Sequence, residues 1–104
     1  MKNYRVKLNG KNFKMELEGK IEKLGFYAAR WVQADNIQEA EIKAVNLVRE
    51  DKSLGAAIRN EMSDSPMIYI DSLTEIDNFD GIDVPGTGYS FYLDEVTKET
   101  QGCS

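Results

Sequence analysis

Apolar and polar side chains alternate at the start of the chain, and this period of two residues is the pattern of a half-buried β-strand. The alternation runs from Tyr4 to Leu8 and resumes from Phe13 to Leu17. Between the two runs lies Asn9-Gly10, a dipeptide suited to a type I′ turn because both central residues take positive φ. The sequence therefore predicts a hairpin that turns at Asn9-Gly10 and buries one side.

The segment from Leu24 to Ala34 predicts a third strand, because aromatic and β-branched residues favour extended backbone. Neither of its faces is polar, since Phe26 and Val32 share one side while Tyr27 and Trp31 share the other. A strand that is apolar on both faces is typical of the middle of a sheet covered on both sides.

Helix signals follow directly. Asn36 is a candidate N-cap, and Glu39 stands three residues later, in the spacing of a capping box. Residues 37–51 contain no Gly or Pro, and their apolar residues follow the i, i+3, i+4 rule. We expect one main helix over about 37–51, packed on one face of the sheet, and a shorter helix over 54–60 capped by Ser53.

The apolar run Met67–Ile70 predicts a strand that continues to Ile76, and Tyr89–Leu93 predicts the last strand, after a loop over 77–88. The elements make a single α+β domain over residues 1–94, in the order β-β-β-α-β-β, with a mostly antiparallel sheet of about five strands. The main helix is a crossover that places the third and fourth strands parallel. Residues 95–104 are polar and are expected to fray.

The chain of 104 residues contains no histidine and a single cysteine, Cys103. Serine–histidine and cysteine–histidine nucleophile pairs and histidine-bearing zinc sites are therefore excluded. One thiol cannot form an intramolecular disulfide, so the fold depends on packing alone. Since no catalytic motif replaces the missing histidine, we expect no enzyme, no catalytic or metal-binding residue and no cofactor.

Charge is unevenly distributed along the chain. Residues 1–60 hold 12 Lys and Arg against 8 Asp and Glu, whereas residues 61–104 hold 1 against 10, and the net charge is −5. This asymmetry predicts two electrostatically distinct faces or pairing between the halves. No apolar run approaches the ~20 residues that span a bilayer, and the first residues lack an apolar signal core, so the cytoplasm is the expected location.

The glycine-rich segment 84–88 invites comparison with loops that hold phosphate through backbone N–H groups. Its spacing matches neither the P-loop nor the dinucleotide fingerprint, so a turn into the last strand is favoured. The candidate ligand loop that remains open consists of Asp80, Asp83, Gly86, Thr87 and Gly88.

Carboxylates recur from Asp71 to Asp83, which suggests a hard cation such as calcium. An EF-hand loop requires an acidic residue five places before its glycine, and that place before Gly81 is Ile76. A solvated acidic edge is therefore favoured over a metal site.

The outer side of the predicted hairpin carries Arg5, Lys7 and Lys14, which could face an anion. Nucleic-acid-binding domains pair such a stripe with a basic overall charge, whereas the isoelectric point here is near 4.7. Solvated charge that protects a strand from aggregation is favoured, and nucleic acid is not an expected partner.

Five aromatic residues are candidates for an interface, because one main helix can cover only one face of the sheet. Tyrosine and tryptophan are enriched in interface cores. A monomer whose 77–88 loop covers the second face is the alternative, and a homodimer is favoured. The candidates are Tyr27, Trp31, Tyr69, Tyr89 and Tyr92.

The run from Val32 to Ala44 resembles a strand-cap-helix signature of bacterial proteins, similar to that of HicB-like antitoxin domains and of other ferredoxin-like modules. The resemblance covers residues 4–50 and implies an architecture of hairpin, strand, helix and strand. The chain lacks the Pro/Gly-rich turn before the third strand and any appended DNA-binding segment, so no functional residues are implied.

Three functions remain at this point. The leading hypothesis is a non-enzymatic protein-interaction module that acts as a homodimer and binds another protein through the sheet aromatics or through its acidic C-terminal half. An antitoxin- or immunity-type inhibitor of a basic protein is one concrete form of it. The second is a small-ligand or anion-binding domain that uses the 77–88 loop and the sheet tyrosines. The third is a histidine-free enzyme that uses carboxylates and tyrosines.

Overall fold

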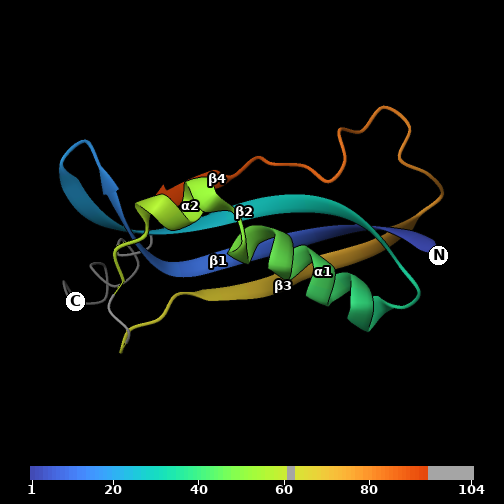
Figure 1. Cartoon of the computed structure of the whole chain (residues 1–104), viewed down its shortest axis with the longest axis horizontal. Helices are drawn as coiled ribbons and strands as arrows, with labels where there is room; N and C mark the ends of the chain where they lie inside the picture. Colours follow the sequence, from blue (N-terminus) through green and yellow to red (C-terminus); the bar gives the residue numbers. More distant parts are fainter. Residues whose placement is uncertain (61–62, 94–104) are drawn as a thin grey trace, which may run out of the picture.

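Four strands form one antiparallel sheet in the order β3-β1-β2-β4, and two helices lie on one face of it (Figure 1). The structure is a computed structural model that describes residues 1–60 and 63–93. The elements are β1 (Lys2–Leu17), β2 (Lys20–Ala34), α1 (Ile37–Arg49), α2 (Lys52–Ala57), β3 (Met67–Ile76) and β4 (Ser90–Leu93). The predicted α+β class is confirmed, with four strands rather than five, and the main helix is accompanied by the short helix α2.

The first two predicted strands are one continuous strand, so the predicted turn at Asn9-Gly10 is wrong. Gly10 pairs with Phe26 and Phe13 pairs with Leu24, which leaves two residues of β1 opposite one residue of β2. This is a β-bulge, and its second residue, Asn12, has φ of 62°. The buried side chains therefore change from even to odd positions in the middle of β1. A turn and a bulge both shift the apolar residues of a sequence from even-numbered to odd-numbered positions, so the sequence pattern does not distinguish them.

The hairpin turn lies nine residues later, at Glu18-Gly19. These two residues have φ of 50° and 83°, the pair of positive values that a type I′ turn requires. Leu17 and Lys20 pair on either side of the turn. The predicted third strand, 24–34, is therefore the second half of β2 and begins four residues earlier than expected.

The side chain of Asn60 completes the bulge. Its amide Nδ2 donates to the carbonyl of Asn12 at 2.8 Å, and its Oδ1 accepts from the backbone N–H of Lys14 at 2.9 Å. The β1–β3 ladder reaches only to the pair Lys11–Met67. Asn60 thus takes the place of a neighbouring strand where β3 no longer reaches β1.

The prediction that the strands before and after the main helix run parallel is confirmed. β1 pairs antiparallel with both β2 and β3, so β2 and β3 run parallel to each other with β1 between them. The bounds of β3 agree with the expected strand, and β4 begins at Ser90, one residue later than expected. The predicted tail, 95–104, lies outside the residues that the structure describes.

Asn36 caps α1 as expected, but Glu39 accepts from the N–H of Asp35 rather than from that of Asn36, and the helix ends at Arg49. The Asn36 side chain accepts from the N–H of Glu39 at 2.8 Å. Asp51, expected inside the main helix, instead caps α2 by accepting from the N–H of Ser53 at 2.9 Å. Ser53 is therefore not the cap. Neither helix in the described part of the chain is long and apolar enough to cross a membrane.

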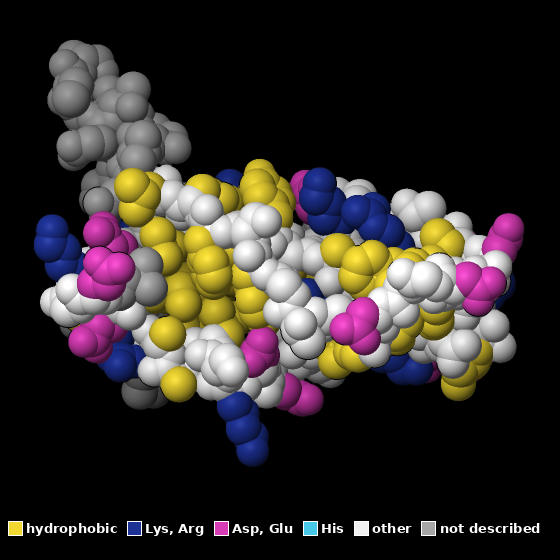
Figure 2. Space-filling model, turned by 90° about the horizontal axis from the view of Figure 1, so that it is seen from above, with side chains coloured by type: hydrophobic (Ala, Val, Ile, Leu, Met, Phe, Trp, Pro, Cys, Tyr) yellow, Lys and Arg dark blue, Asp and Glu magenta, His cyan; other side chains and the backbone are white. Residues whose placement is uncertain are grey.

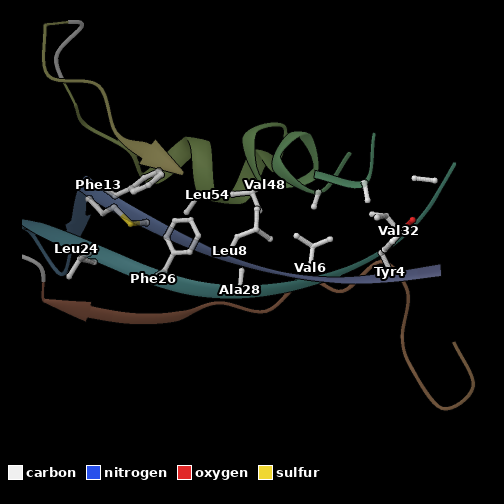
Figure 3. Close-up of a cluster of buried hydrophobic side chains, with 14 residues drawn as sticks. Tyr4, Val6, Leu8, Phe13, Leu24, Phe26, Ala28, Val32, Val48 and Leu54 are labelled. Carbon is white, nitrogen blue, oxygen red and sulfur yellow. The ribbon is translucent and has the colours of Figure 1, made fainter. Parts of the chain in front are cut away.

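The core lies between the helices and the facing side of β1 and β2. Figure 3 shows Leu8 directed from the strands toward Val48 on α1, and Phe26 directed toward Leu54 on α2. Phe26 lies across Gly10, where an added Cβ would stand 2.3 Å from the phenyl ring. Glycine at this position thus makes room for the largest apolar side chain in the centre of the sheet.

Replacing Gly10 with alanine should destabilise the fold by about 1–3 kcal/mol, because the Phe26 ring must move within a packed core. Gly55→Ala in α2 is the matched control, since nothing lies within 4 Å of its added Cβ. That control should stabilise the fold by about 0.5–1 kcal/mol through helix propensity. Urea unfolding measures both, and equal effects at the two sites would contradict the packing.

Candidate interaction surface

The face of the sheet opposite the helices carries four of the five aromatic candidates. Tyr27 and Trp31 occupy odd-numbered positions of β2. Their side chains therefore point away from the core, which the side chains at even-numbered positions face. Figure 3 shows the helices on one side of the sheet and the 77–88 loop passing on the other. We call the following residues the open face: Arg5, Lys7, Asn9, Tyr27, Tyr69 and Tyr92.

Two tyrosines flank a buried asparagine in a row across three strands. Asn9 pairs with Tyr27 of β2 on one side and with Tyr69 of β3 on the other. The two tyrosines are 43% and 46% exposed, whereas Asn9 is only 9% exposed. Rings so exposed on a sheet face provide apolar area for a partner and a hydroxyl at the edge of each ring.

Tyr92 reaches this row from the edge strand by crossing Gly25. An added Cβ at Gly25 would stand 2.3 Å from the Tyr92 ring, so only glycine permits the crossing. The Tyr92 hydroxyl accepts from Asn9 Nδ2 at 2.9 Å, and Asn9 Nδ2 also donates to the carbonyl of Phe26 at 2.9 Å. The ring packs against Tyr27, with centroids 5.5 Å apart.

Charged side chains border the aromatic row. Lys7 Nζ lies 5.6 Å from the centre of the Tyr27 ring and 3.9 Å from Asp71 Oδ2. Tyr27 is therefore held from two directions, by Lys7 and by Tyr92. A ring that is already fixed loses little conformational freedom when a partner binds.

Trp31 lies at the end of the open face, under the loop that joins β3 to β4. Its backbone N–H donates to the Pro85 carbonyl at 3.0 Å. Gly86 has φ of 90°, and an added Cβ there would stand 2.9 Å from both the Ala29 carbonyl and the Trp31 ring. Within the described residues, the indole Nε1 of Trp31 is buried without a hydrogen-bond partner.

A shallow hollow of about 300 Å³ lies beside Trp31 and brings part of the candidate ligand loop to the aromatic residues. Tyr27, Trp31 and Tyr89 line it together with Thr87 and Gly88. Asp80 and Asp83 are exposed elsewhere in the loop and do not line the hollow. Among the residues that the structure describes, no three acidic or cysteine side chains gather as a metal site would require.

Tyr89, the fifth aromatic candidate, lies on the helix side of the sheet. Its hydroxyl donates to Asp51 Oδ2 at 2.6 Å, and its ring faces the Arg30 guanidinium at 4.9 Å. Its contribution is to link β4 to the start of α2. The prediction that all five aromatic residues share one interface is therefore not supported by their placement.

Arg30 is the residue that sequence reasoning missed, since it is only 2% exposed. Its Nη1 donates to the carbonyl of Ala29 at 2.7 Å and to that of Gly88 at 3.1 Å. Its even position in β2, among Ala28 and Val32, already places it on the core side. The alternation of buried and exposed positions along β2 could therefore have predicted that Arg30 is buried, although a buried arginine is uncommon.

Removing the Tyr92 hydroxyl should leave one N–H of the Asn9 amide with only the long contact to the Gly10 carbonyl at 3.4 Å. We expect Tyr92→Phe to destabilise the fold by about 1–3 kcal/mol in urea unfolding, because Asn9 is buried. Tyr69→Phe is the control, since Tyr69 is exposed and should tolerate the change within about 0.5 kcal/mol. Equal losses in both variants would contradict the role of the Asn9 contact.

Burial and the Asp51 hydrogen bond raise the pKa of Tyr89 from 10.0 to about 12. In the unfolded chain the hydroxyl ionises near 10, so this contribution to stability is present below that pH and is lost as the pH rises toward about 12. The difference in unfolding free energy between the wild type and Tyr89→Phe should therefore shrink over this window. If the unfolding free energies of the wild type and of Tyr89→Phe change equally with pH, the Tyr89–Asp51 hydrogen bond does not make this contribution.

Comparison of the chain with protein-family models, with curated proteins and with solved structures finds no match. What the open face does must therefore follow from its own chemistry.

Proposed function

We propose that the chain is a non-enzymatic protein-interaction module that acts as a homodimer and presents its open face to a partner protein. The observation that carries this proposal is the row Tyr69–Asn9–Tyr27, two half-exposed rings on either side of a buried polar residue. In the described part of the chain, no helix lies over these rings (Figure 1).

The partner that fits this surface is a basic protein. Exposed acids follow β3 and the loop after it, and one of them, Asp71, contacts Lys7 at the border of the tyrosine row. They are Asp71, Glu75, Asp77, Asp80 and Asp83. A basic partner would contact the rings and Asp71, and the more distant acids would speed its association. Antitoxin- or immunity-type inhibition of a basic protein is the concrete form that we favour.

A small-ligand or anion-binding domain is the second candidate. The hollow beside Trp31 supports it, because Thr87 and Gly88 of the loop meet Tyr27 there. The indole Nε1, buried without a partner in the described residues, is the polar group that a ligand could approach after a local shift. Protein binding is favoured because the hollow is shallow and the exposed rings lie mostly outside it.

Site-specific photo-crosslinking in the native host tests the proposal. A photoreactive phenylalanine replaces Tyr69 on the open face or, as control, the exposed Asn46 on α1. We expect a discrete adduct with a basic protein from position 69 only, weakened at about 0.5 M salt because the Debye length shrinks to a few ångströms.

Matched substitutions make the result specific. Tyr27→Ser introduced beside the photoreactive residue should reduce the adduct, because it removes the neighbouring ring, whereas Ile42→Ser on α1 should leave the adduct unchanged. Equal labelling from positions 69 and 46, or an adduct insensitive to Tyr27→Ser in a folded variant, would overturn the proposed role of the open face.

A further inference from the structure

The strand β4 leaves an apolar edge uncovered. It is the terminal strand of the sheet and pairs through one edge only, with β2. In the part of the chain that the structure describes, no strand pairs with its outer edge. Phe91 and Leu93, which face the helix side of the sheet, are each 47% exposed.

These two side chains extend the core outward. Phe91 stacks on Tyr89 with centroids 5.7 Å apart and meets Phe26 edge-on at 5.9 Å. The main helix, α1, packs over β1, β2 and β3, so the core layer ends before β4. Figure 2 looks onto this edge and shows apolar side chains gathered toward the left, where β4 and α2 lie in Figure 1.

The opposite edge of the sheet has different chemistry. β3 carries the exposed acids Asp71 and Glu75, and a register shift interrupts its ladder near Asp71. Charges and bulges of this kind prevent two sheets from joining edge to edge. β4 contains no charged residue from Ser90 to Leu93. The acids of β3 would therefore repel a second copy of a chain with net charge −5, whereas the four residues of β4 carry no charge of their own.

We propose that two copies of the chain pair through the outer edges of their β4 strands and form one continuous eight-stranded sheet. This inference rests on the proposed homodimer and identifies its interface. A twofold axis makes the strands antiparallel, and an uncharged apolar edge is complementary to its own copy. Residues directly opposite each other share a face, so Phe91 lies opposite either the partner's Phe91 or the partner's Leu93.

The dimer leaves the open face of each copy free. The open face and the side chains of Phe91 and Leu93 lie on opposite sides of the sheet, so the partner site and the dimer contact do not compete. Four residues form a short ladder, so we expect a dimer that dissociates on dilution through the micromolar range.

Sedimentation velocity on the full chain tests this interface. The wild type should sediment as a dimer of the 11.8 kDa chain. Leu93→Lys should raise the dimer dissociation constant about tenfold or more, because the new charge must be desolvated in the paired edge. Phe91→Lys is the second variant. Ile42→Lys on α1 and Met67→Lys on β3 replace similarly exposed apolar residues and should leave the dimer intact.

Circular dichroism and the emission of Trp31 establish that each variant is folded. Amide exchange at Ser90–Leu93 should slow as the concentration of wild-type protein rises. A wild-type chain that stays monomeric at high micromolar concentration overturns the inference, as does a monomer that dimerises only after residues 94–104 are removed. A dimer that survives both β4 substitutions but is lost in Met67→Lys overturns the β4 interface and leaves the proposed homodimer standing.

Discussion

The bulge in β1 is the constraint on which the rest of the sheet depends. Without the extra residue at Lys11 and Asn12, either the first or the second half of this strand would expose its apolar side chains, because their parity differs. Asn60 makes the bulge tolerable by bonding the carbonyl of Asn12 and the N–H of Lys14. The connection after α2 thus fixes the register of β1 through a contact with a residue 48 positions earlier in the chain.

Two glycines on neighbouring strands then let one aromatic ring cross each face of the sheet. Phe26 crosses Gly10 on the helix side, and Tyr92 crosses Gly25 on the open side. The first crossing completes the core, while the second brings the edge strand into contact with Asn9 in the centre of the open face. The same local device, a ring over a glycine, therefore produces packing on one side and a pre-arranged surface on the other.

Sequence patterns predicted the α+β class, α1 and its cap, β3, and the division of β2 into two faces. They failed at Asn9-Gly10, because a change of parity has the same appearance whether the chain turns or bulges, and Glu18-Gly19 lacks the usual Asn or Asp before glycine. The open-face aromatics Tyr27 and Trp31 followed from parity within one strand. Tyr89 was assigned to the wrong face of the sheet. It lies just before β4, where the path of the loop decides which face its side chain takes, and the alternation of apolar and polar residues does not describe a loop.

The order in which the strands meet has a consequence for how the chain folds as it is synthesised. β1 and β2 join through a two-residue turn, whereas β1 meets β3 through pairs as distant as Asn3 and Ile76. Contacts between distant residues form slowly, since a long loop must close first. The hairpin and α1 can therefore form on the ribosome while one edge of β1 still lacks its neighbour. During that interval β1, a central strand of the native sheet, is an exposed edge with unpaired backbone groups.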